Sequence, residues 1–192
     1  SKTTGWCKSE IGPSRRSFLA MAAMLLIGLL LPFKAVGAVV YQTKEEGMRA
    51  LWPTADRFDL NEIHLDDNQL QKTQALLGES FRKRDYLFYV GHAGEQIVGY
   101  ALILETLGKE RPITFLIGIR PDGKIAGMEV LIYRESEGSS IRHGRFMRQF
   151  HNKGKEDPLQ LGDDIQPISG ATLSSRAATY AARKALALFE VV

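Results

Sequence analysis

Four hydroxyl side chains crowd one short stretch near the C-terminus, Gln-Pro-Ile-Ser-Gly-Ala-Thr-Leu-Ser-Ser at residues 166–175. Pro167 disfavours helix at the residue before it, and Gly170 permits backbone conformations that other residues avoid. Residues 176–190 are rich in good helix formers, so the stretch is expected to open the last helix. A helix start leaves N–H groups unpaired at a positive dipole end, which favours an anion such as phosphate. Hydroxyls before a helix also serve as plain caps, and the residues alone leave both interpretations open.

Charge and cysteine content narrow the classes of function. Residues 1–38 hold five basic side chains and one acid, so the rest of the chain has 20 basic and 21 acidic side chains. This balance gives no argument for nucleic-acid binding. The single cysteine, Cys7, excludes an internal disulfide, a Cys-x-x-Cys-His haem site and a cysteine-rich zinc site. The histidines lack metal-ligand spacing, and without a Gly-x-Ser-x-Gly elbow the hydroxyls do not indicate a hydrolase.

The string Ser-Gly-Ala-Thr-Leu-Ser-Ser at residues 169–175 resembles the flavinylation motif of the FMN-binding domain family. That family includes the flavin-bearing subunits of the Rnf electron-transport complexes and of the sodium-pumping NADH:quinone reductase. In it, a separate flavin transferase esterifies the motif threonine to the phosphate of FMN, which implies covalent FMN on Thr172 here. The resemblance covers roughly residues 86–189. It also implies cofactor contacts from the rest of the motif, namely Ser169, Gly170, Ala171, Leu173 and Ser174.

A second segment carries the resemblance further. The family usually has a Glu-Thr-x-Gly loop against the flavin, and the equivalent here is Glu135-Ser136-Glu-Gly138, without the glycine-rich continuation. The resemblance implies flavin contacts from Glu135, Ser136 and Gly138, with the isoalloxazine ring between this loop and the start of the last helix. The family also usually has Asp three residues before the motif Ser, whereas this chain has Gln166.

The first 40 residues are expected to form a signal sequence or membrane anchor. Arg15-Arg16 followed by Phe-Leu resembles a twin-arginine export signal, and residues 36–38 offer a small-residue cleavage site. The uncharged run Phe18–Phe33 is short for a membrane span, which needs about 20 residues, although extension to residue 40 allows one. Cleavage and retention stay open. Either way, the basic flank stays cytoplasmic and the domain lies outside.

The remaining chain is expected to fold as an α+β domain, an antiparallel sheet packed with helices. Thr43 and Glu46 predict a capping box at the first helix. Hydrophobic periodicity and turn signals predict the other elements. Expected helices are 43–51, 68–83, 144–152 and the last helix; expected strands are 86–90, 96–105, 113–119 and 125–133; residues 54–67, 92–95 and 153–167 are expected to be turns or loop.

These features together predict an extracytoplasmic electron-transfer flavoprotein, anchored or exported, on the periplasmic side of the bacterial inner membrane. Residues 41–192 would form the FMN-binding domain. Expected partners are a flavin transferase for maturation, membrane or periplasmic redox proteins, and the membrane itself if the N-terminal segment is retained. No separate substrate site is evident, so independent enzyme activity stays open. The alternatives are a membrane-anchored sensory or interaction domain of the same fold without flavin, and an enzyme that holds FMN non-covalently.

Overall fold

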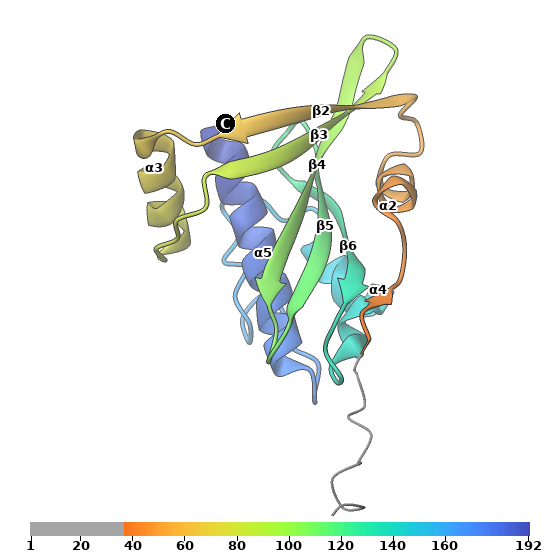
Figure 1. Cartoon of the computed structure of the whole chain (residues 1–192), viewed down its shortest axis with the longest axis vertical. Coiled ribbons are helices and arrows are strands. Elements are labelled where there is room, and N and C mark those ends of the chain that lie inside the picture. The colour runs from red at the N-terminus through yellow and green to blue at the C-terminus, as the bar shows by residue number, and fades with distance from the viewer. Residues whose placement is uncertain (1–36) are drawn as a thin grey trace, which may run out of the picture. The chain divides into compact units, whose positions relative to one another are not determined.

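A six-stranded antiparallel sheet forms the centre of the part of the chain that the computed structural model describes, residues 37–192 (Figure 1). The expectations for residues 1–36 lie outside this range. The strand order is β1-β6-β5-β4-β3-β2, so β2 to β6 form a continuous meander and β1 adds to its far edge. The strands are β1 (Val39–Val40), β2 (Arg57–His64), β3 (Asp85–Ala93), β4 (Gln96–Leu107), β5 (Pro112–Ile119) and β6 (Ile125–Tyr133).

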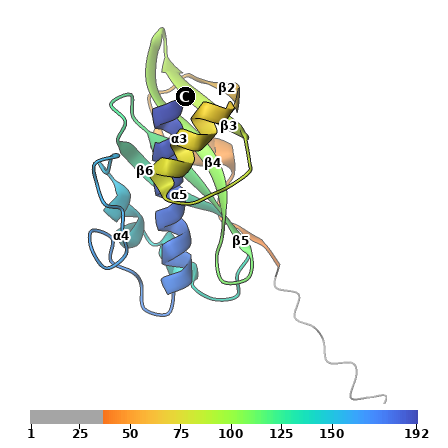
Figure 2. The same ribbon diagram turned by 90° about the vertical axis from the view of Figure 1, so that its left-hand side faces the viewer.

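Helices cover both faces of this sheet. The longest, α5, packs on β4 and β5, and α3 lies beside it; α2 packs on the opposite face, on β5 and β6 (Figures 1 and 2). The predicted α+β architecture is therefore confirmed for the described residues. The helices are α2 (Lys44–Leu51), α3 (Asp67–Leu77), α4 (Gly144–Met147) and α5 (Thr172–Val191), with short 3₁₀ turns η1 (Ser139–Arg142) and η2 (Arg148–Phe150).

Small side chains set the distance between α5 and the sheet. Five alanines of α5 are at most 4% exposed and face a layer of buried strand residues. Alanine has no side chain beyond Cβ, so the helix backbone approaches the strands closely. Thr106 of β4 uses this proximity, because its hydroxyl donates to the carbonyl of Ala177 at 3.1 Å. The alanines are Ala177, Ala178, Ala181, Ala182 and Ala185.

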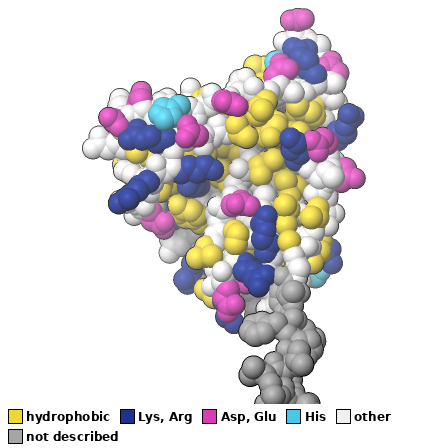
Figure 3. Space-filling model, viewed as in Figure 1, with side chains coloured by type: hydrophobic (Ala, Val, Ile, Leu, Met, Phe, Trp, Pro, Cys, Tyr) yellow, Lys and Arg dark blue, Asp and Glu magenta, His cyan; other side chains and the backbone are white. Residues whose placement is uncertain are grey.

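The opposite face of the sheet uses glycines to admit larger groups. The predicted capping box begins α2, with the Glu46 N–H donating to the Thr43 hydroxyl and the Thr43 N–H donating to the Glu46 carboxylate. Trp52 ends this helix and lies over Gly99 of β4, where a Cβ would be 2.2 Å from the indole ring. Apolar side chains such as Leu60 and Leu87 remain about half exposed on the surface of β2 and β3. Basic and acidic side chains are interspersed over the face in Figure 3, in keeping with the balanced charge of the domain.

Residues 54–67 were expected to be turn-like, and this expectation is wrong. Arg57–His64 form edge strand β2, which pairs with β3 over its whole length. All eight of its side chains are exposed or partly exposed, so burial imposes no apolar alternation on its sequence. Its outer edge carries charged side chains instead, among them Arg57, which contacts Asp59 at 3.5 Å.

Three other elements also differ from the prediction. Helix α3 ends at Leu77 rather than near residue 83, because Gly78 adopts the left-handed conformation at φ 71° and closes the helix. The predicted turn at residues 92–95 is shorter than expected, since β3 continues through His92 to Ala93. The segment expected to be helical at 144–152 divides into α4 and the 3₁₀ turn η2. The other predicted strands are confirmed, and β6 has the predicted limits.

The first described strand precedes residue 41, where the domain was expected to begin. Val39 and Val40 form β1 and pair with Tyr133 and Ile132 of β6. The Tyr41 N–H then donates to the Leu131 carbonyl at 2.9 Å, which continues the attachment to β6. Within residues 37–192, no helix is both long enough and apolar enough to cross a membrane.

We expect Gly99→Ala to destabilise the domain by about 1–3 kcal/mol, because the rigid Trp52 indole cannot yield to a Cβ at 2.2 Å. Gly144→Ala is the control. Its Cβ would meet only the end of the flexible Arg148 side chain at 3.0 Å, so its effect should stay within about 0.5 kcal/mol. Urea denaturation of both variants measures the difference, and equal stabilities would contradict this account of the Trp52 contact.

Candidate functional site

The first turn of α5 has free backbone donors. Its N-cap is Ala171, whose side chain cannot accept a hydrogen bond, so the interpretation of the hydroxyls as plain caps is wrong. The first helical bond runs from the Ser175 N–H to the Ala171 carbonyl at 2.8 Å. Within residues 37–192, the N–H groups of Thr172, Leu173 and Ser174 have no acceptor. The positive end of a 20-residue helix is therefore open to an anion.

The four hydroxyls of the motif have different environments. Ser174 and Ser175 are 4% and 0% exposed. The Ser175 hydroxyl accepts from the Ile168 N–H at 3.2 Å, and the Ser174 hydroxyl bonds Tyr133. Ser169 and Thr172 are exposed, and their hydroxyls have no partner in the described part of the chain. Only these two hydroxyls are free to react with an incoming group.

A directed chain of hydrogen bonds joins the first turn of α5 to the loop after β6. The Tyr133 hydroxyl bonds both the Glu137 carbonyl and the Ser174 hydroxyl, the latter at 2.8 Å. A carbonyl only accepts, so Tyr133 donates its proton to Glu137 and Ser174 must donate to Tyr133. Burial raises the pKa of Tyr133, and the Ser174 hydrogen bond offsets this only in part, so the phenol keeps the proton it donates.

Gly138 brings the two predicted halves of the site together. It has φ 84°, a left-handed conformation that favours glycine. A Cβ there would lie 2.6 Å from the Ser174 hydroxyl oxygen and 2.8 Å from the Tyr133 hydroxyl oxygen. The loop after β6 therefore contacts the motif through Gly138. Tyr133 makes this contact possible, but its apolar, strand-forming neighbours in the sequence mark it only as a core residue.

Glu135 contacts the turn between β4 and β5. Its carboxylate accepts the N–H groups of Glu110 and Arg111 at 2.7 and 3.0 Å, in the turn between β4 and β5. Desolvation acts to raise the pKa of Glu135, but hydrogen bonds from the backbone at Arg111, Glu110 and Lys109 outweigh it, and the pKa is lowered. Ser136 is exposed and contributes to neither contact. The structure thus gives Glu135 a role in fixing the turn, while its predicted contact with a flavin stays a prediction.

Gln166, which stands where the family usually has Asp, is turned away from the motif. Its side-chain amide donates to the Asp163 carbonyl at 3.2 Å. Its backbone is held by Gln149, whose side chain accepts from the Gln166 N–H at 2.8 Å and donates to the Gln166 carbonyl at 3.1 Å. The position therefore serves to fix the segment that leads into the motif.

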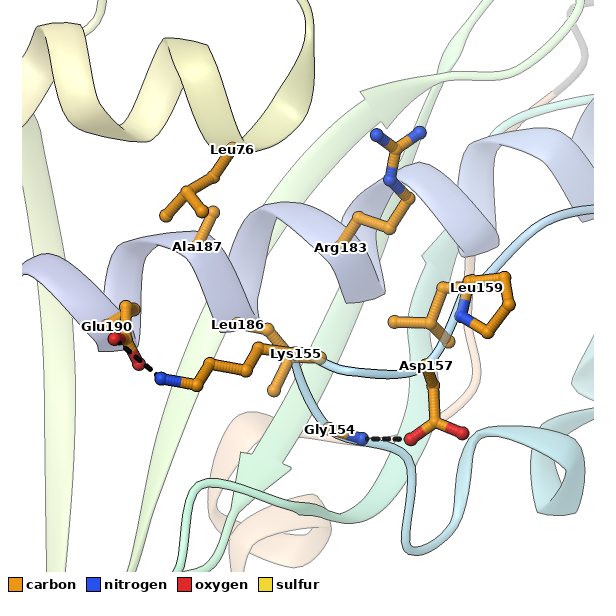
Figure 4. A pocket seen from close by; sticks show the side chains of 10 residues that line it. Leu76, Gly154, Lys155, Asp157, Leu159, Arg183, Leu186, Ala187 and Glu190 are labelled. Atoms are coloured by element: carbon orange, nitrogen blue, oxygen red, sulfur yellow. Dashed lines mark hydrogen bonds and ion pairs between the residues drawn. The ribbon is translucent and has the colours of Figure 1, made fainter.

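A separate pocket lies beside the C-terminal half of α5 (Figure 4). Its volume is about 150 Å³, below the range of about 300–1,000 Å³ that is usual for ligand pockets. The Lys155–Glu190 ion pair, at 2.8 Å, lies on its rim. Arg183, on its wall, is roughly 16 Å along the helix from Thr172, given 1.5 Å per residue. The pocket is too small and too distant to hold a flavin joined to the motif.

Comparison with known proteins agrees with this site. Residues 108–187 match the family model described as the FMN-binding domain, and the match includes both the loop after β6 and the motif at α5. This segment is similar to the FMN-binding domain family. The resemblance inferred from the motif is confirmed, and the family assignment supports FMN as the ligand of the domain.

Two curated relatives extend the comparison. Over 112 residues the chain is 29% identical to one subunit of the proton-translocating ferredoxin:NAD(+) oxidoreductase complex of Clostridium ljungdahlii. The matched region covers 54% of this chain and 59% of the relative. It is 26% identical over 112 residues to the corresponding subunit of the Na(+)-translocating ferredoxin:NAD(+) oxidoreductase complex of Acetobacterium woodii, covering 53% and 54%. The chain thus matches little more than half the length of each relative.

The contacts of Glu135 predict a specific pH dependence of stability. A carboxyl whose pKa is lowered by folding stabilises the fold above its ordinary pKa, 4.5 here, and loses this contribution as the pH falls through the folded pKa. Wild type should therefore lose more unfolding free energy than Glu135→Gln between about pH 6 and about pH 3. The control Glu110→Gln alters an exposed side chain of the same turn and should retain the wild-type pH dependence. Urea denaturation measures the unfolding free energy at each pH. If it falls equally with pH in wild type and Glu135→Gln, the hydrogen bonds from the Glu110 and Arg111 N–H groups to Glu135 contribute nothing to stability.

Proposed function

We propose that this protein is an FMN-bearing subunit of a membrane-bound electron-transport complex, with FMN joined through its phosphate to Thr172. FMN exchanges one or two electrons, so it can connect partners of different type. The protein supplies the attachment point, the surroundings and the electrostatics of the flavin. In this proposal the domain lies on the extracytoplasmic side of the membrane.

The accessibility of the Thr172 hydroxyl is the observation that carries the proposal. Of the four motif hydroxyls, those of Ser174 and Ser175 are buried and hydrogen-bonded. Thr172 presents an exposed hydroxyl at the first residue of α5. Ser169 is also exposed but precedes the helix by three residues, with Gly170 at φ 76° between them. Thr172 is therefore the hydroxyl that an enzyme can reach while the phosphate stays beside the helix start.

The chemistry of attachment is a phosphoryl transfer. The Thr172 oxygen forms a bond to the flavin phosphorus as a phosphoanhydride bond of a flavin dinucleotide breaks. A nucleoside monophosphate leaves, and the hydroxyl proton passes to a base. Within residues 37–192, no basic side chain contacts the Thr172 hydroxyl. We therefore assign the base to the transferase. The product is a phosphodiester that keeps one negative charge.

The free donors at the start of α5 suit that charge. The N–H groups of Thr172, Leu173 and Ser174 lie in the first turn, where the helix dipole is positive. A phosphate at this position satisfies donors that otherwise depend on water. A capping side chain such as Ser or Thr would have accepted a hydrogen bond from these N–H groups. Because the N-cap is Ala171, the N–H groups remain available.

The names of the relatives and the N-terminal sequence support membership of a membrane complex. Both relatives are subunits of ion-translocating ferredoxin:NAD(+) oxidoreductase complexes. Residues 1–38 combine a basic flank with an uncharged apolar run, the pattern of a signal or anchor. A flavin transferase would modify the domain, and other redox subunits would exchange electrons with it.

Replacement of the attachment residue gives the main test. We expect Thr172→Ala, produced in a host that contains the transferase, to lack covalent flavin completely and to lose electron transfer. Its stability should stay within about 0.5 kcal/mol of wild type, because the side chain is exposed and does not cap the helix. Thr172→Ser retains the hydroxyl and should keep partial modification. Intact mass and peptide mapping locate the flavin.

The neighbouring hydroxyls are the matched controls. Ser169→Ala, Ser174→Ala and Ser175→Ala should each retain FMN on Thr172, with lower yield where a buried hydrogen bond is lost. Finding the FMN mass on Ser169, or finding it in folded Thr172→Ala, would remove Thr172 from the mechanism. A colourless wild-type protein from the same host would instead support the sensory or interaction domain without flavin.

Topology can be tested separately at the C-terminus. Val192 is 52% exposed, so a reporter fused there should leave the domain intact. We expect a reporter that requires export to be active and one that requires the cytoplasm to be inactive. The opposite pattern would refute the extracytoplasmic location. Lys substitutions at Arg15 and Arg16 test the twin-arginine route, and unchanged export would indicate the general secretory pathway.

A further inference from the structure

Apolar side chains are exposed at one end of the sheet. Leu107, the last residue of β4, is 68% exposed, which is the largest fraction among the large apolar side chains of residues 37–192. Val39 and Val40 of β1 are 49% and 61% exposed, and Leu173 in the first turn of α5 is 42% exposed. Isolated apolar residues on a surface need no explanation, whereas a group of them marks a contact with another apolar phase.

The pairing of the strands places these residues at the same end of the domain. Val39 pairs with Tyr133, the last residue of β6, and the Tyr133 hydroxyl bonds Ser174 in the first turn of α5. Leu107 ends β4 where the chain turns towards β5. Figure 1 shows this turn, the loop after β6 and the start of α5 together at one end of the domain. Three separate elements therefore expose apolar side chains there.

The turn that follows Leu107 is fixed by hydrogen bonds. The Gly108 N–H donates to the Arg111 carbonyl at 3.0 Å. The Glu135 carboxylate accepts the N–H groups of Glu110 and Arg111 at 2.7 and 3.0 Å. A turn that is already ordered loses little further conformational entropy when its exposed side chain enters another phase.

The charged side chains of this turn suit a lipid headgroup layer. Lys109 and Arg111 are exposed at its tip. Long basic side chains can lay their methylene groups along an apolar surface while the charge stays among the headgroups. Glu110 offsets one of these charges, and the partly buried Glu135 carboxylate is committed to the N–H groups of the turn. The turn thus combines an exposed apolar side chain with basic ones, a combination that favours contact with an anionic bilayer.

The length of chain before β1 indicates a bilayer as the partner of this surface. Five residues, 34–38, join the apolar run Phe18–Phe33 to Val39. A chain of this length reaches about 20 Å when fully extended. With the apolar run held in a bilayer as an anchor, the end of the sheet that contains β1 stays within this reach of the lipid.

We propose that the turn between β4 and β5 contacts the lipid bilayer, with Leu107 inserted among the lipids and Lys109 at the headgroups. The inference rests on the proposed membrane location and takes residues 1–36 as a retained anchor. A contact beside the anchor restricts the tilt of the domain and keeps the start of α5 on the membrane side.

Two positions on the same strand give a matched test of depth. The test uses full-length protein in nanodiscs of phosphatidylcholine and phosphatidylglycerol, with Cys7→Ser to remove the single native cysteine. A nitroxide label is attached through Leu107→Cys or, as the control, through Ile97→Cys. Ile97 is 43% exposed near the other end of β4, about 33 Å from Leu107 at about 3.3 Å per residue.

Electron paramagnetic resonance compares the collisions of each label with oxygen, which is concentrated in lipid, and with a polar nickel chelate. We expect the ratio of oxygen to chelate accessibility to be at least about twofold higher at position 107 than at position 97, because the lipid interior excludes the polar chelate. Equal ratios at the two positions would overturn the contact.

The role of the Leu107 side chain is tested with the label at Glu110→Cys, an exposed position at the tip of the turn. Leu107→Asp should lower the accessibility ratio of this label, since a charged side chain stays in water. Leu60→Asp changes a 49% exposed leucine of β2 and should leave the ratio unchanged. The same ratio in Leu107→Asp and in the parent protein would show that Leu107 is not inserted.

The state of the flavin is measured separately, by intact mass of unlabelled wild type. Absence of covalent flavin together with a high accessibility ratio at position 107 would refute the attachment to Thr172 and support the lipid contact. Covalent flavin together with equal ratios at positions 107 and 97 would support the attachment and overturn the lipid contact.

Discussion

The close packing of α5 on the sheet is the constraint on which the rest of the structure depends. Five buried alanines bring the helix backbone near the strands. The hydrogen bond from the Thr106 hydroxyl to the Ala177 carbonyl fixes the position of α5 along β4. The helix cannot slide without breaking this bond and opening voids in a close-packed interior. The first turn of α5 is consequently held at the end of the sheet where the loop after β6 and the turn between β4 and β5 also lie.

Loops at that end are held by backbone groups and a few buried side chains. The Tyr133 hydroxyl donates a hydrogen bond to the Glu137 carbonyl and accepts one from the Ser174 hydroxyl. Glu135 fixes the neighbouring turn through two N–H groups, and Gln149 fixes the segment before the motif. Each of these side chains forms hydrogen bonds within the protein. Thr172 remains exposed without such a partner, which separates the groups that support the site from the hydroxyl that is free to react.

Sequence reasoning was most successful where local signals are strong. The capping box at Thr43, the turn after β5 and the limits of β6 follow from short-range chemistry, and the motif at residues 169–175 indicated the family. Strand β2 was missed because an edge strand with little burial has no required alternation of apolar residues. The roles of Tyr133 and Glu135 were also beyond prediction, since their partners lie 41 and 24–25 residues away in the sequence. The hydrogen bonds between Gln149 and Gln166 likewise join two segments that only the fold brings together.

The exposed edge at β2 has a consequence for behaviour in solution. An open strand of eight residues presents unpaired N–H and C=O groups, which are a template for pairing with another chain. Arg57, Asp59 and Glu62 place charged side chains on both faces of this strand, and charges along an edge strand oppose the addition of a second copy. The same side chains that concealed β2 in the sequence therefore protect the domain against edge-to-edge aggregation at high concentration.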